Sequence, residues 1–231
     1  MSTPHVLNVL KVFVGTDGNP TGGNPLGVFL DGGGVPEQAR QRVAAELGFS
    51  ETVFVDDPRA GALRIFTPAA ELPFAGHPLV GAAWLLAREG LEVDALRPPA
   101  GEAPVRHEGE MTYITGRPEW APPFEHVEYG SPEEVDALDG PPHGLGHAGA
   151  WAWEDEAAGR VRARVFAPAL GVPEDEATGA HAVRLCARLG REISIRQGVG
   201  SRIEARPLAD GSVEIGGRVE PVEQREFEVK G

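Results

Sequence analysis

Two stretches of sequence, one hundred residues apart, decide the fold. They read RIFTPAAELPFAGHPLVGAAWLLAREG at residues 64–90 and RVFAPALGVPEDEATGAHAVRLCARLG at residues 164–190. They align without a gap and are identical at 10 of 27 positions, where chance would give roughly two or three. Convergence of two similar strand–loop–helix segments would explain this, but a duplicated α+β unit explains it better.

The duplication predicts an α+β fold of two similar lobes. Each lobe then contains a strand, an irregular loop and a helix that begins at the loop. Between the two copies lies RPEWAPP, residues 117–123, a proline-rich run typical of a linker. We therefore expect an N-terminal lobe at residues 1–117 and a C-terminal lobe at residues 118–231.

Hydrophobic periodicity and turn residues predict the other elements. Helices are expected at residues 36–47, 81–88, 132–138 and about 180–189, the first of them ending at Gly48. Strands are expected at residues 6–14, 26–30, 51–55, 63–66, 111–115, 160–166, 192–197, 201–206 and 212–215. The Asp210-Gly211 pair predicts a hairpin between the last two strands.

Composition excludes several classes of function. The 231 residues carry a formal net charge of −14, which disfavours both nucleic acids and anionic membranes as partners. A single cysteine, Cys186, excludes an intramolecular disulfide framework. No stretch approaches the roughly 20 apolar residues of a membrane span, and the N-terminus lacks a signal-peptide pattern. We expect a soluble, cytoplasmic protein.

Cofactor signatures are missing from the sequence. No GxxxxGK[ST] motif is present and no GxGxxG follows a strand, so no nucleotide is expected. His143 and His147 are four residues apart, but the glycines between them disfavour a helical zinc pair. We therefore expect neither a metal nor a nucleotide.

Two side chains are candidates for acid–base chemistry, and a third stands in an acidic run. Glu51 enters an apolar strand, where partial burial would raise its pKa, although spacing alone favours a strand-edge position that faces water. His77 lies at the first loop-to-helix junction and is either structural or a proton acceptor. Asp175 stands between Glu174 and Glu176; such a run usually caps a helix, and a metal site is the less favoured alternative.

The two loop-to-helix junctions are rich in small residues. Unobstructed N–H groups at a helix start attract anions, so two facing junctions would hold a small carboxylic acid between the lobes. Close packing of the helices would require the same small residues, and for one junction alone that explanation is the better one. We prefer the anion site because both junctions share the feature.

The motifs taken together resemble the phenazine-biosynthesis isomerase (PhzF-like) family. They are Gly23-Asn24-Pro25-Leu26, Ser50-Glu51-Thr52, Phe66-Thr67-Pro68, Pro73-Phe74-Ala75-Gly76-His77-Pro78, Glu174-Asp175-Glu176-Ala177-Thr178-Gly179, Gln197-Gly198 and Gly216-Gly217. The resemblance implies the diaminopimelate epimerase-like fold, in which each lobe wraps a mixed sheet around a central helix. It also implies a homodimer.

The resemblance further implies a cofactor-independent isomerase that shifts a proton on a small carboxylic acid. Glu51 would move the proton, and His77 and Asp175 would line the same site. Substrate contacts would come from the group Asn24, Gly76, Thr178, Gly179 and Ala180, with backbone groups of Gly76, Thr178 and Gly179 holding the carboxylate. The cysteine pair of related racemases is absent, and Cys186 is expected to be buried in a helix.

Three departures from the family pattern leave a second hypothesis open. Glu176 stands where the family usually has proline, Ala180 where it has serine, and Gly200-Ser201-Arg202-Ile203 replaces an expected Gly-Arg-Pro-Ser element. A substrate-contacting hydroxyl is therefore missing at position 180. A non-catalytic protein that retains the acid-binding site is the alternative to an isomerase.

Overall fold

The fold is described by a computed structural model over residues 3–15 and 22–229, in which strands cover more residues than helices. The strands are β1 (Thr3–Val14), β2 (Asn24–Phe29), β3 (Glu51–Asp57), β4 (Ala62–Phe66), β5 (Glu71–Leu72), β6 (Ala95–Leu96), β7 (Ala103–Glu108), β8 (Met111–Gly116), β9 (Glu125–Glu128), β10 (Ala148–Asp155), β11 (Arg160–Ala167), β12 (Val172–Asp175), β13 (Ile193–Gln197), β14 (Ser201–Pro207) and β15 (Val213–Val229). The helices are α1 (Glu37–Leu47), α2 (Gly76–Arg88), α3 (Pro132–Asp136) and α4 (Gly179–Leu189). Short 3-10 turns cover η1 (Gly32–Gly34), η2 (Pro118–Trp120), η3 (Pro142–Gly144) and η4 (Pro168–Leu170).

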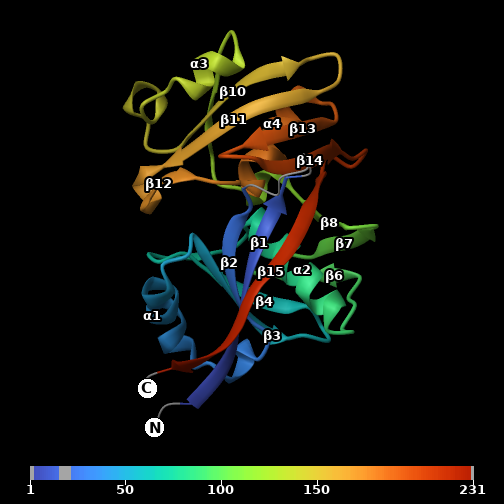
Figure 1. Cartoon of the computed structure of the whole chain (residues 1–231). Coiled ribbons are helices and arrows are strands. Elements are labelled where there is room, and N and C mark those ends of the chain that lie inside the picture. Colours follow the sequence, from blue (N-terminus) through green and yellow to red (C-terminus); the bar gives the residue numbers. More distant parts are fainter. Residues whose placement is uncertain (1–2, 16–21, 230–231) are drawn as a thin grey trace.

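A mixed sheet joins the two halves of the chain. Its order is β5-β4-β3-β2-β1-β15-β14-β13-β11-β10-β9, with β8 also paired to β15. Strand β15 is the link: residues 213–216 pair with β14, and residues 218–229 pair with β1. Figure 1 shows β15 running from the upper part of the molecule to the lower part, beside β1. The division into lobes at residue 117 stays a prediction.

The duplicated unit is confirmed, and both copies contain a similar arginine–glutamate ion pair. In the first copy, Arg64 of β4 forms a two-pronged contact with Glu71 and lies over the Phe66 ring. In the second copy, Arg164 of β11 does the same with Glu174 and Phe166. Each unit continues into a largely buried helix, α2 and α4 respectively. The expected α+β fold with two similar units is therefore observed.

Several elements differ from the sequence-based expectation. Helix α2 begins at Gly76, five residues earlier than expected, because Pro78 in the first turn needs no N–H partner there. The last strand does not stop at Ile215 but continues to Val229. Its second part, EPVEQREFEV, is mostly exposed and highly charged, so it lacks an apolar signal. Strands β7 and β10 were not expected.

Turn residues behave as expected at the other boundaries. Gly48 ends α1 in a left-handed conformation with φ 69°. The Asp210-Gly211 hairpin joins β14 to β15, with Gly211 at φ 83° and the Ser212 N–H donating to the Asp210 carboxylate. These positions have backbone geometries that glycine adopts without steric strain.

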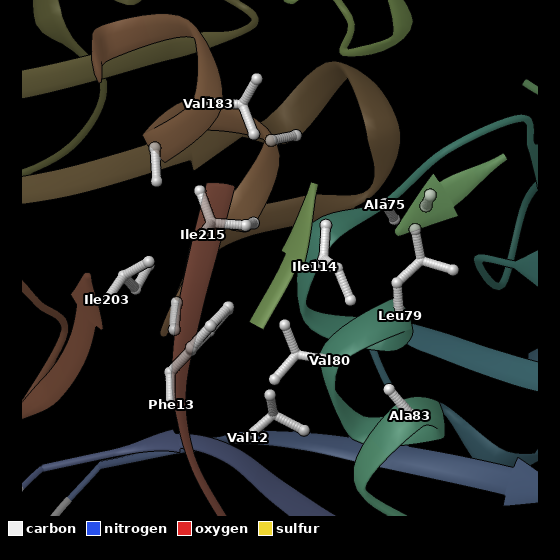
Figure 2. Close-up of a cluster of buried hydrophobic side chains, with 14 of the residues drawn as sticks. Val12, Phe13, Ala75, Leu79, Val80, Ala83, Ile114, Val183, Ile203 and Ile215 are labelled. Atoms are coloured by element: carbon white, nitrogen blue, oxygen red, sulfur yellow. The ribbon is translucent and has the colours of Figure 1, made fainter. Parts of the chain in front are cut away.

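The largest core cluster fills the space between the two helices and the sheet. Figure 2 shows Leu79 and Val80 of α2, Ile114 of β8 and Ile215 of β15 pointing into one cluster, with Val183 of α4 on its other side. All five side chains are fully buried. Because this cluster contains both helices, it fixes the two repeated units relative to each other.

The two helices meet through glycines at their first residues. A Cβ atom added to Gly76 would lie 2.7 Å from the Gly179 Cα atom, and one added to Gly179 would lie 2.7 Å from the Gly76 Cα atom. The Ile215 side chain closes the same space at 2.6 Å and 2.8 Å. Neither position has room for a side chain, so the helices approach backbone to backbone.

Gly179→Ala is expected to lower the free energy of unfolding by about 1–3 kcal/mol, because overpacking at a backbone contact forces the helices apart. Urea unfolding measures the change. The matched control is Gly140→Ala, at a position where an added Cβ meets nothing within 4 Å. Equal midpoints for the two variants would contradict the packing described here.

Candidate active site

A cavity of about 380 Å³ opens between the two repeated units. Its walls are mainly apolar, and residues from both halves of the chain contribute to them. The apolar lining includes Leu72, Pro73, Phe74, Ala75, Trp120, Ala121, Pro122, Pro123, Phe124, Val165, Ala167, Val172 and Ala180. The polar lining consists of Ser50, Glu51, Thr67, Glu119, His147, Asp175, Thr178 and Arg184. A cavity of this size accommodates a small organic molecule.

Glu51 lies in this cavity wall at the first residue of β3. Its side chain is 15% exposed. Burial, and secondly the negative charge of Asp175, raise its pKa to about 8, while a hydrogen bond with Ser50 opposes the rise. At neutral pH the protonated form of the Glu51 carboxyl therefore predominates, with a smaller ionised fraction.

His77 stands behind Glu51 in the first turn of α2. Its Nε2 atom lies 3.5 Å from Glu51 Oε2, and neither atom has a hydrogen-bond partner among the described residues. Burial lowers the pKa of His77 to about 3, against a hydrogen bond to the backbone of Pro25. Because Nε2 has no such bond, Nδ1–H is the group that donates to Pro25. The Nε2 lone pair then faces the protonated Glu51 carboxyl.

Asp175 approaches the same cavity from the second unit. Its Oδ1 accepts a hydrogen bond from Asn24 Nδ2 at 2.7 Å, and its Oδ2 accepts one from Thr178 Oγ1 at 2.6 Å. Asn24 also donates to the Ala177 carbonyl at 2.9 Å and accepts from Ser50 Oγ at 3.1 Å. Asn24 thus connects the Glu51 strand with the Asp175 loop.

The two carboxyl groups both have raised pKa values. Burial raises the pKa of Asp175 to about 6, with the Thr178 and Asn24 hydrogen bonds opposing the rise. The negative charge of Asp175 adds to burial in raising the pKa of Glu51. Neighbouring carboxyl groups with perturbed pKa values are candidates for a paired acid and base.

The predicted anion-binding junctions are only partly exposed to the cavity. Thr178 and Ala180 line it, whereas Gly76 and Gly179 do not and are buried against each other. Close helix packing therefore accounts for these two glycines, and their contact with a substrate stays a prediction. The N-cap residues Ala75 of α2 and Thr178 of α4 make no side-chain capping hydrogen bond to their own helix. The Thr178 N–H at the start of α4 donates to Gln197 Oε1 at 3.2 Å.

The acidic run before α4 does not cap the helix, because each carboxylate has a partner elsewhere. Glu174 pairs with Arg164, and Asp175 with Asn24 and Thr178. Glu176 accepts a hydrogen bond from Ser201 Oγ at 2.7 Å, and the same hydroxyl accepts one from the Gly23 N–H at 2.8 Å.

Glu176 and the segment near Ser201 thus support one another. This pair of departures from the family pattern builds a bridge from the Asp175 loop to Gly23, next to Asn24. Gln197 adds a second support, since its amide nitrogen donates to the Asp175 carbonyl at 2.8 Å and to Thr178 Oγ1 at 2.9 Å.

Much of the cavity wall was not predicted from the sequence. Trp120 lies in the segment predicted to be a linker, Phe124 directly follows that segment, and His147 and Arg184 were not selected. The available signal was two aromatic residues within a proline-rich run, which a solvated linker would not need. No pattern in the sequence indicates the position of Arg184 relative to the cavity.

Neither thiol chemistry nor a membrane span is supported by the geometry. Cys186 is buried in α4, as expected, and burial raises its pKa to about 12. Across residues 3–15 and 22–229, no three His, Cys, Asp or Glu side chains are grouped closely enough to hold a metal ion. In the same ranges no helix has both the length and the apolarity to cross a membrane.

Fold and site together define a protein of two similar α+β units with two carboxyl groups, those of Glu51 and Asp175, in a cavity between the units. The sequence profile of the phenazine biosynthesis-like (PhzC-PhzF) family matches residues 14–141. The chain is also 34% identical over 261 aligned residues to the trans-2,3-dihydro-3-hydroxyanthranilate isomerase of Pseudomonas aeruginosa, covering 88% of this chain and 90% of that protein. The chain belongs to the phenazine biosynthesis-like family.

Solved structures agree with this assignment. A predicted epimerase from Pseudomonas aeruginosa superimposes with a TM-score of 0.71 at 26% identity, covering 96% of this chain and 99% of the other. A hydroxyproline epimerase from Agrobacterium vitis shares the fold, with a TM-score of 0.62 at 11% identity, covering 99% and 93% of the two chains. The named relatives support an isomerase function.

The raised pKa of Glu51 makes stability depend on pH in a predictable direction. A carboxyl whose pKa is higher in the folded state than in the unfolded state stabilises the fold fully below the unfolded value of about 4.5. That contribution is lost as pH rises through about 8. Glu51→Gln removes the titration, so at pH 8.5 it should exceed wild type in free energy of unfolding by at least about 1.4 kcal/mol.

Urea unfolding from pH 5 to pH 9 measures this difference. Glu119→Gln is the matched control, because Glu119 lines the same cavity but is exposed. A difference between Glu51→Gln and wild type that stays constant over this range would contradict a protonated Glu51.

Proposed function

We propose that the protein is a cofactor-independent isomerase that shifts a proton on a small carboxylic acid by general acid–base catalysis. One observation carries the proposal: a buried, protonated carboxyl group, Glu51, stands in the wall of an apolar cavity and faces the unprotonated Nε2 atom of His77 at 3.5 Å. The proposal is also supported by relatives named as isomerases.

The proton shift itself would use Glu51 in both directions. The ionised carboxyl removes a proton from one carbon of the bound acid, and the resulting Glu51 carboxylic acid returns it to another carbon. A carboxyl with a pKa near 8 is a stronger base than an ordinary one, which favours the first step. His77 Nε2, 3.5 Å from Glu51 Oε2, would accept a hydrogen bond from the protonated carboxyl after a small approach and so orient it between the two steps.

The substrate carboxylate would bind where α2 and α4 meet. The N-cap residues of the two helices make no side-chain cap, and the partial positive charge of the helix N-termini would attract an anion. Thr178 lines the cavity at this position.

A non-catalytic acid-binding protein is the second candidate, and Ala180 favours it. This residue lines the cavity and offers no hydroxyl group. The two candidates differ in one respect: only the isomerase exchanges a carbon-bound proton with solvent.

Solvent deuterium incorporation tests the proposal. Wild type is incubated in D₂O with trans-2,3-dihydro-3-hydroxyanthranilate, the substrate that the relatives' name specifies, and with other small cyclic acids. Glu51→Gln should reduce incorporation by at least about a hundredfold, since general acid–base catalysis contributes 10²–10⁴-fold. Glu119→Gln serves as the control within the same cavity and should retain activity.

Exchange by Glu51→Gln within tenfold of wild type would refute the role of Glu51. No exchange by wild type on any acid that binds would favour the acid-binding protein instead.

We also propose that the chain forms a homodimer, as its family resemblance implies. Sedimentation equilibrium at micromolar concentration should give a mass close to twice 24.5 kDa. A single species of 24.5 kDa across the concentration range would refute it.

A further inference from the structure

The cavity has a second polar end, formed by Arg184. This residue belongs to α4, one turn after Ala180, and both residues line the cavity. Four helical residues correspond to a rise of about 6 Å. The cavity therefore extends along α4, from the helix start beside Asp175 towards Arg184. Between the two ends its walls carry Phe74, Trp120 and other apolar side chains.

The charge of Arg184 is not neutralised by a carboxylate. Its Nε and Nη2 atoms both donate to one backbone carbonyl, that of Ala121, at 3.0 Å and 2.6 Å. Elsewhere in the same half of the chain, Arg162 and Arg164 each pair with a carboxylate, Asp136 and Glu174. Among the described residues Arg184 forms no ion pair.

Arg184 retains unused donors. A guanidinium group carries five N–H bonds in a planar fork. Two nitrogens are engaged by the Ala121 carbonyl, and Nη1 has no partner among the described residues. A cation beside an apolar cavity gains most from a bound anion, since a charge in such surroundings is costly unless paired.

The neighbouring histidines do not supply or cancel this charge. His147 lines the cavity and is within 2.7 Å of the Pro123 carbonyl through Nδ1. Burial, with the Arg188 and Arg184 charges, lowers the pKa of His126 to about 4. Burial and the Arg184 charge also lower the pKa of His147, against its hydrogen bond to Pro123, so both shifts disfavour a second cation beside Arg184. Arg184 is also the one cationic residue in the cavity lining, where Glu119 is exposed and makes no pair with it.

We propose that Arg184 is a specificity-determining residue that binds a second anionic group, so that the preferred ligands are dicarboxylates with an apolar body. This rests on the proposed function for the position of the first carboxylate, at the meeting point of α2 and α4. The two carboxylates then bind at opposite ends of the cavity, and the apolar walls contact the body between them. Monocarboxylates fill only one end.

Calorimetric binding measurements at pH 7.5 test this with matched probes. Terephthalate and 4-carboxycinnamate are each compared with the monomethyl ester that keeps the shape and removes the distal charge. Wild type should bind at least one diacid about tenfold more tightly than its ester, as expected for a charged hydrogen bond. Arg184→Met should reduce that ratio to within about twofold, and Arg184→Lys should restore part of it.

Arg188→Met is the matched control, because Arg188 is exposed one turn further along α4 and does not line the cavity. It should leave the diacid-to-ester ratio unchanged. Arg184→Met also loses the hydrogen bonds to the Ala121 carbonyl, and thermal unfolding measures any resulting loss of stability. A destabilised fold would weaken the binding of diacid and ester equally, whereas lost recognition would weaken only the binding of the diacid. A wild-type protein that binds neither diacid better than its ester, or an Arg184→Met variant with the wild-type ratio, would overturn the proposal.

Failure of this inference is distinguishable from failure of the proposed function. Deuterium exchange that depends on Glu51, combined with no effect of Arg184→Met on the ratio, would overturn only the role of Arg184. A diacid-to-ester affinity ratio that depends on Arg184, combined with no deuterium exchange, would support the binding role of Arg184. The protein would then be an acid-binding protein and not an isomerase.

Discussion

The backbone contact between Gly76 and Gly179 determines how the site is assembled. Because neither residue has a side chain, the first turns of α2 and α4 meet at van der Waals distance. This contact brings two residues to the same region. His77 directly follows Gly76, and Asp175 lies four residues before Gly179. The Ile215 side chain and the surrounding hydrophobic core pack against this contact. The arrangement of the candidate site thus depends on how two glycines pack, and neither glycine has a side chain that could react.

Burial shifts the pKa values of three side chains. It raises the pKa of Glu51, and the charge of Asp175 adds to this rise. It lowers the pKa of His77 in the first turn of α2. It raises the pKa of Asp175, against the hydrogen bonds from Thr178 and Asn24. The bridge through Glu176, Ser201 and Gly23 ends next to Asn24, which donates to Asp175.

The sequence contained enough information to predict the repeated unit but not the full sheet. The identities between residues 64–90 and 164–190 reflect real contacts, such as those of Arg64 and Arg164. The second part of β15 could not be predicted, because its exposed, charged residues carry no hydrophobic period. Glu51, His77 and Asp175 were found through motif and burial arguments. Arg184 and Trp120 were not, since cavity walls depend on tertiary packing that local patterns do not encode.

The protonation state of Glu51 in the folded protein is the central claim. Carbon-13 NMR of selectively labelled glutamate measures it directly, with Glu51→Gln used to assign the side-chain carboxyl resonance. The account predicts a titration midpoint near pH 8 for this carboxyl, well above those of the exposed glutamates. A midpoint near the ordinary value of about 4.5 would contradict it.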